Sequence, residues 1–137
     1  MKLLLVDDQE SIRETVKGFL KHLIGDIKID EASDGDKAFR LYRRKRGRYD
    51  LVLTDIDHPG LDGLDLAKAI LKKNPAQALA IVTASGVAGK IVPLGSLAPK
   101  FLRSIPLELK DILVLGKPYE FKQLLALIHT SVKMAHR

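Results

Sequence analysis

The chain has 137 residues, the length of one domain, and its 46% hydrophobic and 29% charged residues are ordinary for a globular protein. The absence of cysteine excludes a disulfide framework and a thiolate metal site, and no apolar run approaches the roughly 18 residues of a membrane span. We therefore expect one cytoplasmic domain, with any metal bound by oxygen because the histidines lack zinc-ligand spacing.

Short apolar runs alternate with amphipathic stretches along most of the chain, which is typical of parallel strands joined by helical crossovers. The predicted strands are residues 2–6, 28–31, 51–54, 79–83 and 112–115. The predicted helices fall within residues 11–25, 33–47, 63–75 and 119–137. The pattern favours an α/β fold with a doubly wound, five-stranded parallel sheet in a single domain, residues 1–137.

Apolar residues at helical spacing define the inner faces of the first and last helices. The predicted stripes are Ile12, Val16, Phe19, Leu20 and Leu23 in the first helix, and Phe121, Leu124, Leu125 and Ile128 in the last. Gly25 and Gly47 are expected to stop the first two helices, and Ser33 or Asp34 to begin the second.

Residues 84–111 break the regular pattern, since they contain three glycines and three prolines. The only element predicted there is a short helix at residues 97–103, capped by Ser96. We expect an irregular segment between the fourth and fifth strands.

The run "RRKRGR" at residues 43–48 supplies five of the 23 basic side chains in a chain of net charge +6. Its cations suit the negative end of a helix dipole, so one interpretation is a solvated helix end. The other is a basic patch for nucleic acid or for an acidic partner.

Polar side chains lie at the carboxyl ends of four predicted strands, where an open parallel sheet binds its ligands. They are Asp7 and Asp8, Asp55, Thr83, and Lys117 with Pro118. Each alone has a structural explanation, as a helix cap, a turn residue, a β-branched strand residue or a surface cation. Together they indicate a site.

Clustered carboxylates restrict the chemistry of such a site. Two like charges about 4 Å apart repel by roughly 4 kcal/mol at an effective dielectric near 20, so the cluster takes up a proton or binds a cation. Mg²⁺ suits carboxylate oxygens and completes its coordination with phosphate. An aspartate can attack phosphorus to give an acyl phosphate, with Thr83 and Lys117 contacting the phosphoryl oxygens.

Four segments, "LLLVDDQESIRE", "DLVLTDIDHPGLDGLDL", "AIVTASG" and "LGKPYEFKQLL", closely resemble the receiver domains of two-component response regulators. The likeness covers residues 1 to about 86 and 112–137. It implies a flavodoxin-like fold and a phosphoryl group donated from phosphohistidine by a histidine kinase or histidine phosphotransfer protein, with Mg²⁺.

The resemblance also implies roles for individual residues. Asp55 is the expected phosphoacceptor, Asp8 a direct metal ligand, Asp7 a direct or water-bridged ligand, and the backbone carbonyl of Asp57 a third protein ligand. Thr83 is expected to sense a phosphoryl oxygen.

The same family pattern assigns the two remaining positions near the pocket. Lys117 is expected to contact the phosphoryl group and to precede a cis peptide bond to Pro118. Ile12, on the first helix, is either a contact for the phosphodonor or a member of the core stripe.

Three departures from the family pattern stand out. Val114 occupies the position of the usual aromatic switch residue, so coupling through that switch is in doubt. Residues 84–111 replace the usual fourth helix, which indicates a different partner, a homodimer through the region after Thr83, or no inducible switch. Asp57 and His58 follow the acceptor at variable or usually apolar positions, and Asp57 is expected to alter the lifetime of the acyl phosphate.

Two other functions stay open. One is an interaction module that has kept the fold and lost phosphotransfer. The other is a phosphatase with an aspartate nucleophile, because Asp55 and Asp57 form an Asp-x-Asp pair after an apolar strand. A regulatory protein without an output domain, direct DNA binding or a membrane segment is the main expectation, with no catalysis beyond self-phosphorylation and autodephosphorylation.

Overall fold

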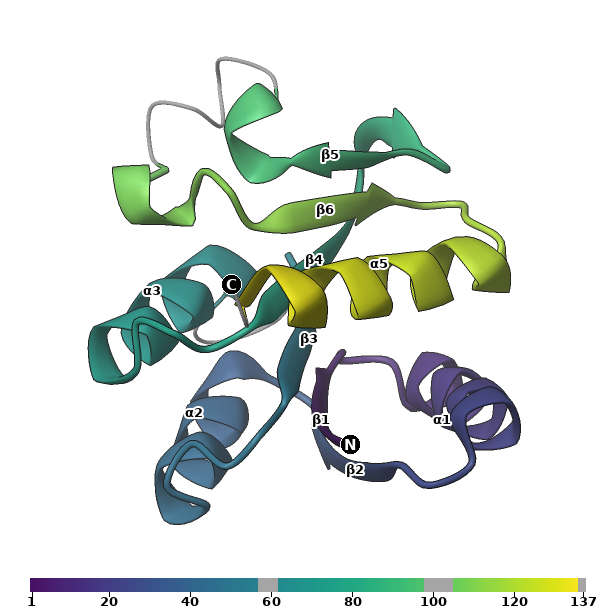
Figure 1. Ribbon diagram of the computed structural model, residues 1–137, viewed down its shortest axis with the longest axis horizontal. Coiled ribbons are helices and arrows are strands. Elements are labelled where there is room, and N and C mark those ends of the chain that lie inside the picture. The colour runs from purple at the N-terminus through teal and green to yellow at the C-terminus, as the bar shows by residue number, and fades with distance from the viewer. Residues whose placement is uncertain (57–61, 98–104, 136–137) are drawn as a thin grey trace.

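One six-stranded sheet forms the centre of the computed structural model, which describes residues 1–56, 62–97 and 105–135 (Figure 1). The strands are β1 (Lys2–Val6), β2 (Lys28–Ala32), β3 (Leu51–Asp55), β4 (Leu79–Ala88), β5 (Ile91–Pro93) and β6 (Leu113–Gly116). Their order is β2-β1-β3-β4-β6-β5, with every neighbouring pair parallel except β5 and β6.

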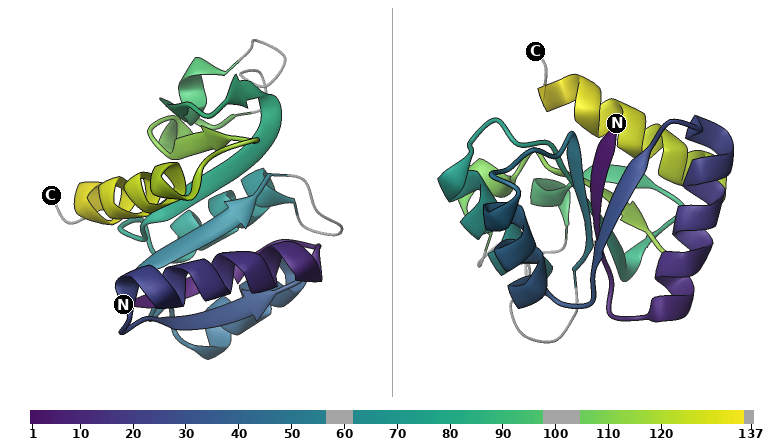
Figure 2. Two further views of the ribbon diagram at one scale, coloured as in Figure 1. Left: turned by 90° about the vertical axis from the view of Figure 1, so that its right-hand side faces the viewer. Right: turned by 90° about the horizontal axis from the view of Figure 1, so that it is seen from below.

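Helices cover both faces of this sheet. They are α1 (Glu10–Ile24), α2 (Gly35–Arg44), α3 (Gly63–Lys73) and α5 (Phe121–Ala135). α1 and α5 lie on one face, and α2 and α3 on the other (Figure 2). The predicted doubly wound α/β fold is therefore confirmed. In the described part of the chain, no helix is long and apolar enough to cross a membrane.

Alternation along β1 shows how the sheet separates two cores. Leu3 and Leu5 pack with α1 and α5, whereas Leu4 and Val6 pack with α2 and α3. Successive side chains of a strand point to opposite faces, so a strand with four consecutive apolar residues must be covered on both sides. Each fully buried leucine contributes about 2 kcal/mol, and this burial holds the carboxyl end of β1 firmly.

The helix ends follow their predicted signals in two places. Gly25 takes a φ of 74° after α1 and its N–H bonds to Lys21 O at 3.1 Å. Asp34 begins α2 by accepting a hydrogen bond from the N–H of Lys37 at 2.8 Å.

The predicted apolar stripes are correct at their centres and wrong at their ends. Leu23 is 47% exposed, because Ile24 and Ile27 fill that end of the core instead. Phe121 is 38% exposed, and its ring stacks on Phe19 with centroids 4.0 Å apart.

The segment after Thr83 differs most from its prediction. β4 continues to Ala88, and the chain then turns at Gly89, where φ is 68°, so that β5 pairs antiparallel with the outer edge of β6. Gly116 allows the crossing, because a Cβ there would lie 2.7 Å from the nitrogen of Ala88. Short 3₁₀ turns at Leu94–Ser96 and Leu107–Leu109 complete the described part of this segment, which contains no α-helix. Residues 98–104, most of the predicted helix at 97–103, lie outside the described residues.

Candidate functional site

The carboxyl ends of β1 and β3 form the centre of the candidate site. These strands are neighbours, and Val6 pairs with Thr54. From β1 the chain crosses to β2 on one side, whereas from β3 it crosses to β4 on the other. Ligands bind at such a switch point in open α/β sheets, and Asp7 and Asp55 occupy it.

Three carboxylates gather at this point. Asp7, Asp8 and Asp55 each offer an oxygen, and these oxygens all lie within 4.8 Å of one another. Asp7 is only 6% exposed, Asp55 is half-buried and Asp8 is exposed. The cluster thus has one buried, one intermediate and one solvent-facing carboxylate.

Local hydrogen bonds hold Asp7 in place. Its N–H donates to Ala32 O at 3.1 Å, and its carboxylate accepts from the N–H of Gln9 at 2.9 Å. Arg13 donates through Nη1 to the carbonyl of Asp7 at 2.7 Å and through Nε to Glu31 at 3.1 Å. The start of α1 and the edge of the sheet therefore position the first acidic residue together.

Lys117 brings a cation to the cluster from β6. Its Nζ lies 2.9 Å from Oδ2 of Asp55, and its N–H donates to Thr83 O at 2.7 Å. The bond between Lys117 and Pro118 is cis. Thr83 is fully buried within β4. The ends of three strands thus meet around Asp55.

The electrostatics of the site favour an additional cation. Burial, followed by the charges of Asp55 and Asp8, raises the pKa of Asp7 above its ordinary value, although the hydrogen bond from Gln9 and the charge of Lys117 oppose the shift. Burial disfavours the charged form of Lys117, but the hydrogen bond and charge of Asp55 outweigh it and raise the pKa of Lys117. Three carboxylates facing one ammonium group fit a hard divalent cation, which prefers oxygen ligands.

Gly63 sets the distance between α3 and the end of β3. Its N–H donates to Ile56 O at 2.9 Å, and a Cβ at this position would lie 2.8 Å from the Cα of Ile56. Only glycine permits this approach without a shift of the backbone. Asp62, the residue before it, begins α3 by accepting from the N–H of Asp65 at 2.9 Å.

Tyr119 is a site residue that the sequence reasoning missed. It lines a small cavity of about 20 Å³ together with Asp7, Asp55, Lys117 and Ile12. Burial raises the pKa of its hydroxyl, partly offset by the charge of Lys117. Its place two residues after Lys117, across a proline, is the only sequence signal that could have indicated it.

The structure places the other candidate residues as follows. Ile12 is half-buried, borders this cavity and packs against the core beneath α1 and α5. Val114 is fully buried in β6. Asp57 and His58 lie outside the described residues, so the backbone carbonyl expected as a metal ligand is not placed.

Comparisons with known proteins agree on the family. Residues 3–94 match the model of the response regulator receiver domain. The chain is 32% identical over 133 residues, 96% of its length and 51% of the relative's, to the uncharacterized transcriptional regulatory protein YcbL of Bacillus subtilis. It is 43% identical over 70 residues to the chemotaxis protein CheY-3 of Vibrio cholerae, which covers 51% of this chain and 52% of CheY-3.

A solved structure extends the likeness to the whole fold. The receiver domain of HemR from Leptospira biflexa superposes with a TM-score of 0.74 at 29% identity, covering 96% of this chain and 93% of that one. The chain spans about half the length of the curated relatives it matches. With the acidic cluster at the switch point of its sheet and the family match over residues 3–94, the chain belongs to the response regulator receiver domains.

Proposed function

We propose that this receiver accepts a phosphoryl group on Asp55 from the phosphohistidine of a histidine kinase or histidine phosphotransfer protein. The observation that carries the proposal is the position of Asp55, inside the carboxylate cluster and 2.9 Å from Lys117. We infer a regulatory role from the family match over residues 3–94.

The transfer is a simple displacement at phosphorus. A carboxylate oxygen of Asp55 forms the new P–O bond as the P–N bond of the donor breaks, and the imidazole leaves with the electron pair of that bond. Most of the required catalysis is positioning and charge neutralisation. Asp7, Asp8, Asp55 and the backbone carbonyl of Asp57 are the residues that would hold Mg²⁺, which neutralises negative charge at the phosphoryl oxygens when bound.

Lys117 and Thr83 have complementary parts in this proposal. The raised pKa of Lys117 keeps its ammonium group charged at neutral pH. When Asp55 becomes an acyl phosphate, Lys117 turns from the carboxylate to a phosphoryl oxygen, and the hydroxyl of Thr83 donates to another. Because the N–H of Lys117 is bonded to Thr83 O, a movement of either residue is transmitted between β4 and β6.

One specific observation favours a second candidate, an interaction module without phosphotransfer. Val114 is an aliphatic residue at the expected switch position, and the segment between β4 and β6 contains the extra strand β5 and two 3₁₀ turns. In this second candidate, the surface formed by β5 and its flanking turns binds a partner without phosphorylation.

Intact-mass measurement after incubation with acetyl phosphate and Mg²⁺ tests the proposal. We expect one phosphoryl adduct on the parent, none on Asp55→Asn, and a normal adduct on Asp65→Asn, a control that changes an exposed carboxylate on α3. Beryllofluoride should also produce a spectroscopic change in the parent, and only when Mg²⁺ is present. An unmodified parent, or an Asp55→Asn protein labelled as well as the parent, contradicts the proposal.

A further inference from the structure

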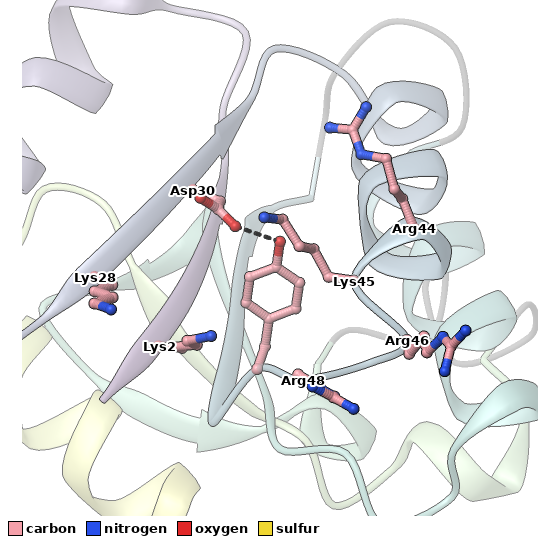
Figure 3. Close-up of a pocket in the computed structure, with 8 residues that line it drawn as sticks. Lys2, Lys28, Asp30, Arg44, Lys45, Arg46 and Arg48 are labelled. Atoms are coloured by element: carbon pink, nitrogen blue, oxygen red, sulfur yellow. Dashed lines mark hydrogen bonds between the residues drawn. The ribbon is translucent and has the colours of Figure 1, made fainter.

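A large basic pocket lies at the edge of the sheet opposite the acidic cluster. Its volume is about 500 Å³. Lys2 and Lys28 begin β1 and β2 on one side, while the end of α2 and the loop leading to β3 form the other (Figure 3). The lining residues are Lys2, Lys28, Asp30, Arg44, Lys45, Arg46, Arg48 and Tyr49.

The charge of this pocket is strongly one-sided. Six cations and a single carboxylate line it, and that carboxylate, on Asp30, already accepts a hydrogen bond from the hydroxyl of Tyr49 at 2.6 Å. Within residues 1–56, 62–97 and 105–135, none of the six cations forms an ion pair. A solvated helix end accounts for the arginines of "RRKRGR", but it does not account for the two lysines that the β-sheet brings to the same pocket.

Lys2 and Lys28 are placed together against their mutual repulsion. They are register partners on neighbouring parallel strands, and both are exposed. Like charges at paired positions of a sheet destabilise it. An anion bound between these side chains would remove that cost.

Arg46 occupies a backbone position where any residue other than glycine is costly. α2 ends in a Schellman motif, in which the N–H of Gly47 bonds to Tyr42 O at 2.9 Å and the N–H of Arg46 bonds to Arg43 O at 3.0 Å. This arrangement puts Arg46 at the position that glycine usually fills, with a φ of 54°. A side chain in this left-handed conformation costs about 1 kcal/mol.

We propose that the basic pocket binds a small, compact anion that carries two or more linked phosphate groups. Guanidinium groups pair with phosphate oxygens through parallel hydrogen bonds, and lysines add point charges. The cations come from strands and from a helix end around one hollow rather than along an extended face, so the geometry fits a short phosphate chain better than a duplex. The ring of Tyr49 is only 7% exposed, so the phosphate chain, and not a stacked base, is what the pocket recognises.

Calorimetric titration of the Asp55→Asn protein in EDTA tests this site separately from phosphotransfer, because neither Mg²⁺ nor the acceptor is then present. The probes are tripolyphosphate, ATP, orthophosphate and adenosine. We expect tripolyphosphate and ATP to bind and adenosine not to bind. Equal affinity for the two supports recognition of the phosphate chain alone, and much tighter binding of ATP contradicts it.

Two charge-neutralising variants remove cations from opposite sides of the pocket. Lys2→Gln/Lys28→Gln removes the strand cations, and Lys45→Gln/Arg48→Gln removes two of the three that follow α2. Each should weaken binding about tenfold or more, the loss of one good charge-assisted contact. The matched control, Lys68→Gln/Lys72→Gln, changes the same net charge on the exposed face of α3 and should bind like the parent.

Thermal denaturation of the same variants separates loss of the site from loss of folding. Lys2→Gln/Lys28→Gln should be at least as stable as the parent, because it removes like-charge repulsion. The proposal is overturned if neither phosphate compound binds at low ionic strength, or if the control weakens binding as much as the pocket variants. It is also overturned if double-stranded DNA binds more tightly than tripolyphosphate and depends on the same lysines, which would make the pocket part of a nucleic-acid surface.

Discussion

Replacing Asp7 by asparagine should stabilise the metal-free protein and weaken its response to Mg²⁺. Asparagine keeps the oxygen that accepts the hydrogen bond from the N–H of Gln9, so the local structure is retained. What changes is the charge of the most buried carboxylate in the cluster. The perturbation is therefore mainly electrostatic.

The size of the effect follows from the geometry of the cluster. Two unit charges 4.8 Å apart, the upper limit for these oxygens, repel by about 3.5 kcal/mol at an effective dielectric near 20. Lys117, 2.9 Å from Asp55, offsets most of that neighbour's charge, and solvent screens the exposed Asp8. We therefore expect a gain of about 1 kcal/mol at neutral pH, which raises Tm by roughly 4 °C for a domain of this size.

The gain should depend on pH in a definite direction. Because the folded-state pKa of Asp7 is raised above 3.8, the folded protein holds this proton more tightly than the unfolded chain. The parent consequently loses stability as the pH rises from the unfolded value through the raised folded value. The asparagine variant lacks this loss, so the difference between the two proteins is absent in acid and complete above the folded-state pKa.

Thermal denaturation in EDTA between about pH 4 and pH 8 measures this difference, and repeating it in excess Mg²⁺ provides the second arm. Bound cation should stabilise the parent more than the variant, which reduces or reverses the order of the two Tm values. A variant that is less stable than the parent in EDTA at neutral pH, or a difference that does not change with pH, refutes the electrostatic reasoning.

Three further predictions concern stability, each measured by urea denaturation. Gly116→Ala should lower the free energy of unfolding by about 2 kcal/mol, because its Cβ would lie 2.7 Å from the nitrogen of Ala88. The control Gly18→Ala, which has open space around it on α1, should raise the free energy of unfolding by about 0.5–1 kcal/mol. Equal effects of the two substitutions would contradict the close crossing at Gly116. Arg46→Gly should raise the same quantity by about 1 kcal/mol by relieving the left-handed φ of 54°, and a loss would show that this arginine stabilises the fold through contacts. Ser131→Ala should raise it by about 1 kcal/mol, since Oγ is buried with no hydrogen-bond partner among the described residues; a marked loss would reveal a partner for this hydroxyl.

Local signals in the sequence predict most of the fold. Apolar runs such as residues 3–6 and 51–53 indicate strands that are buried on both faces of a sheet. The helix ends at Gly25 and Asp34 follow from the conformation and hydrogen bonding of those residues alone. These signals come from neighbouring residues, so they can be recognised without the tertiary structure.

The convergence of Asp7, Asp8, Asp55 and Lys117 was also predictable, because in a parallel sheet the residues that follow the strands must meet at one edge. Tyr119 was not, since its place beside Lys117 depends on the path of the chain after β6. Prediction of a site from strand ends therefore finds the residues on the strands and misses those that the following loops bring in.

Two features came only from the tertiary structure. β5 is three residues long and contains Pro93, so no periodicity could indicate it; it forms because β4 passes over Gly116 and returns along the free edge of β6. The basic pocket joins "RRKRGR" to Lys2 and Lys28, which lie at least 15 residues away in the chain. The sequence by itself determined the helices, the parallel strands and the acidic cluster at the edge of the sheet, because these depend on periodicity and strand direction. The pairing of β5 with β6 and the meeting of distant cations in the basic pocket were decided by the tertiary structure, because they depend on contacts between segments that only the folded chain brings together.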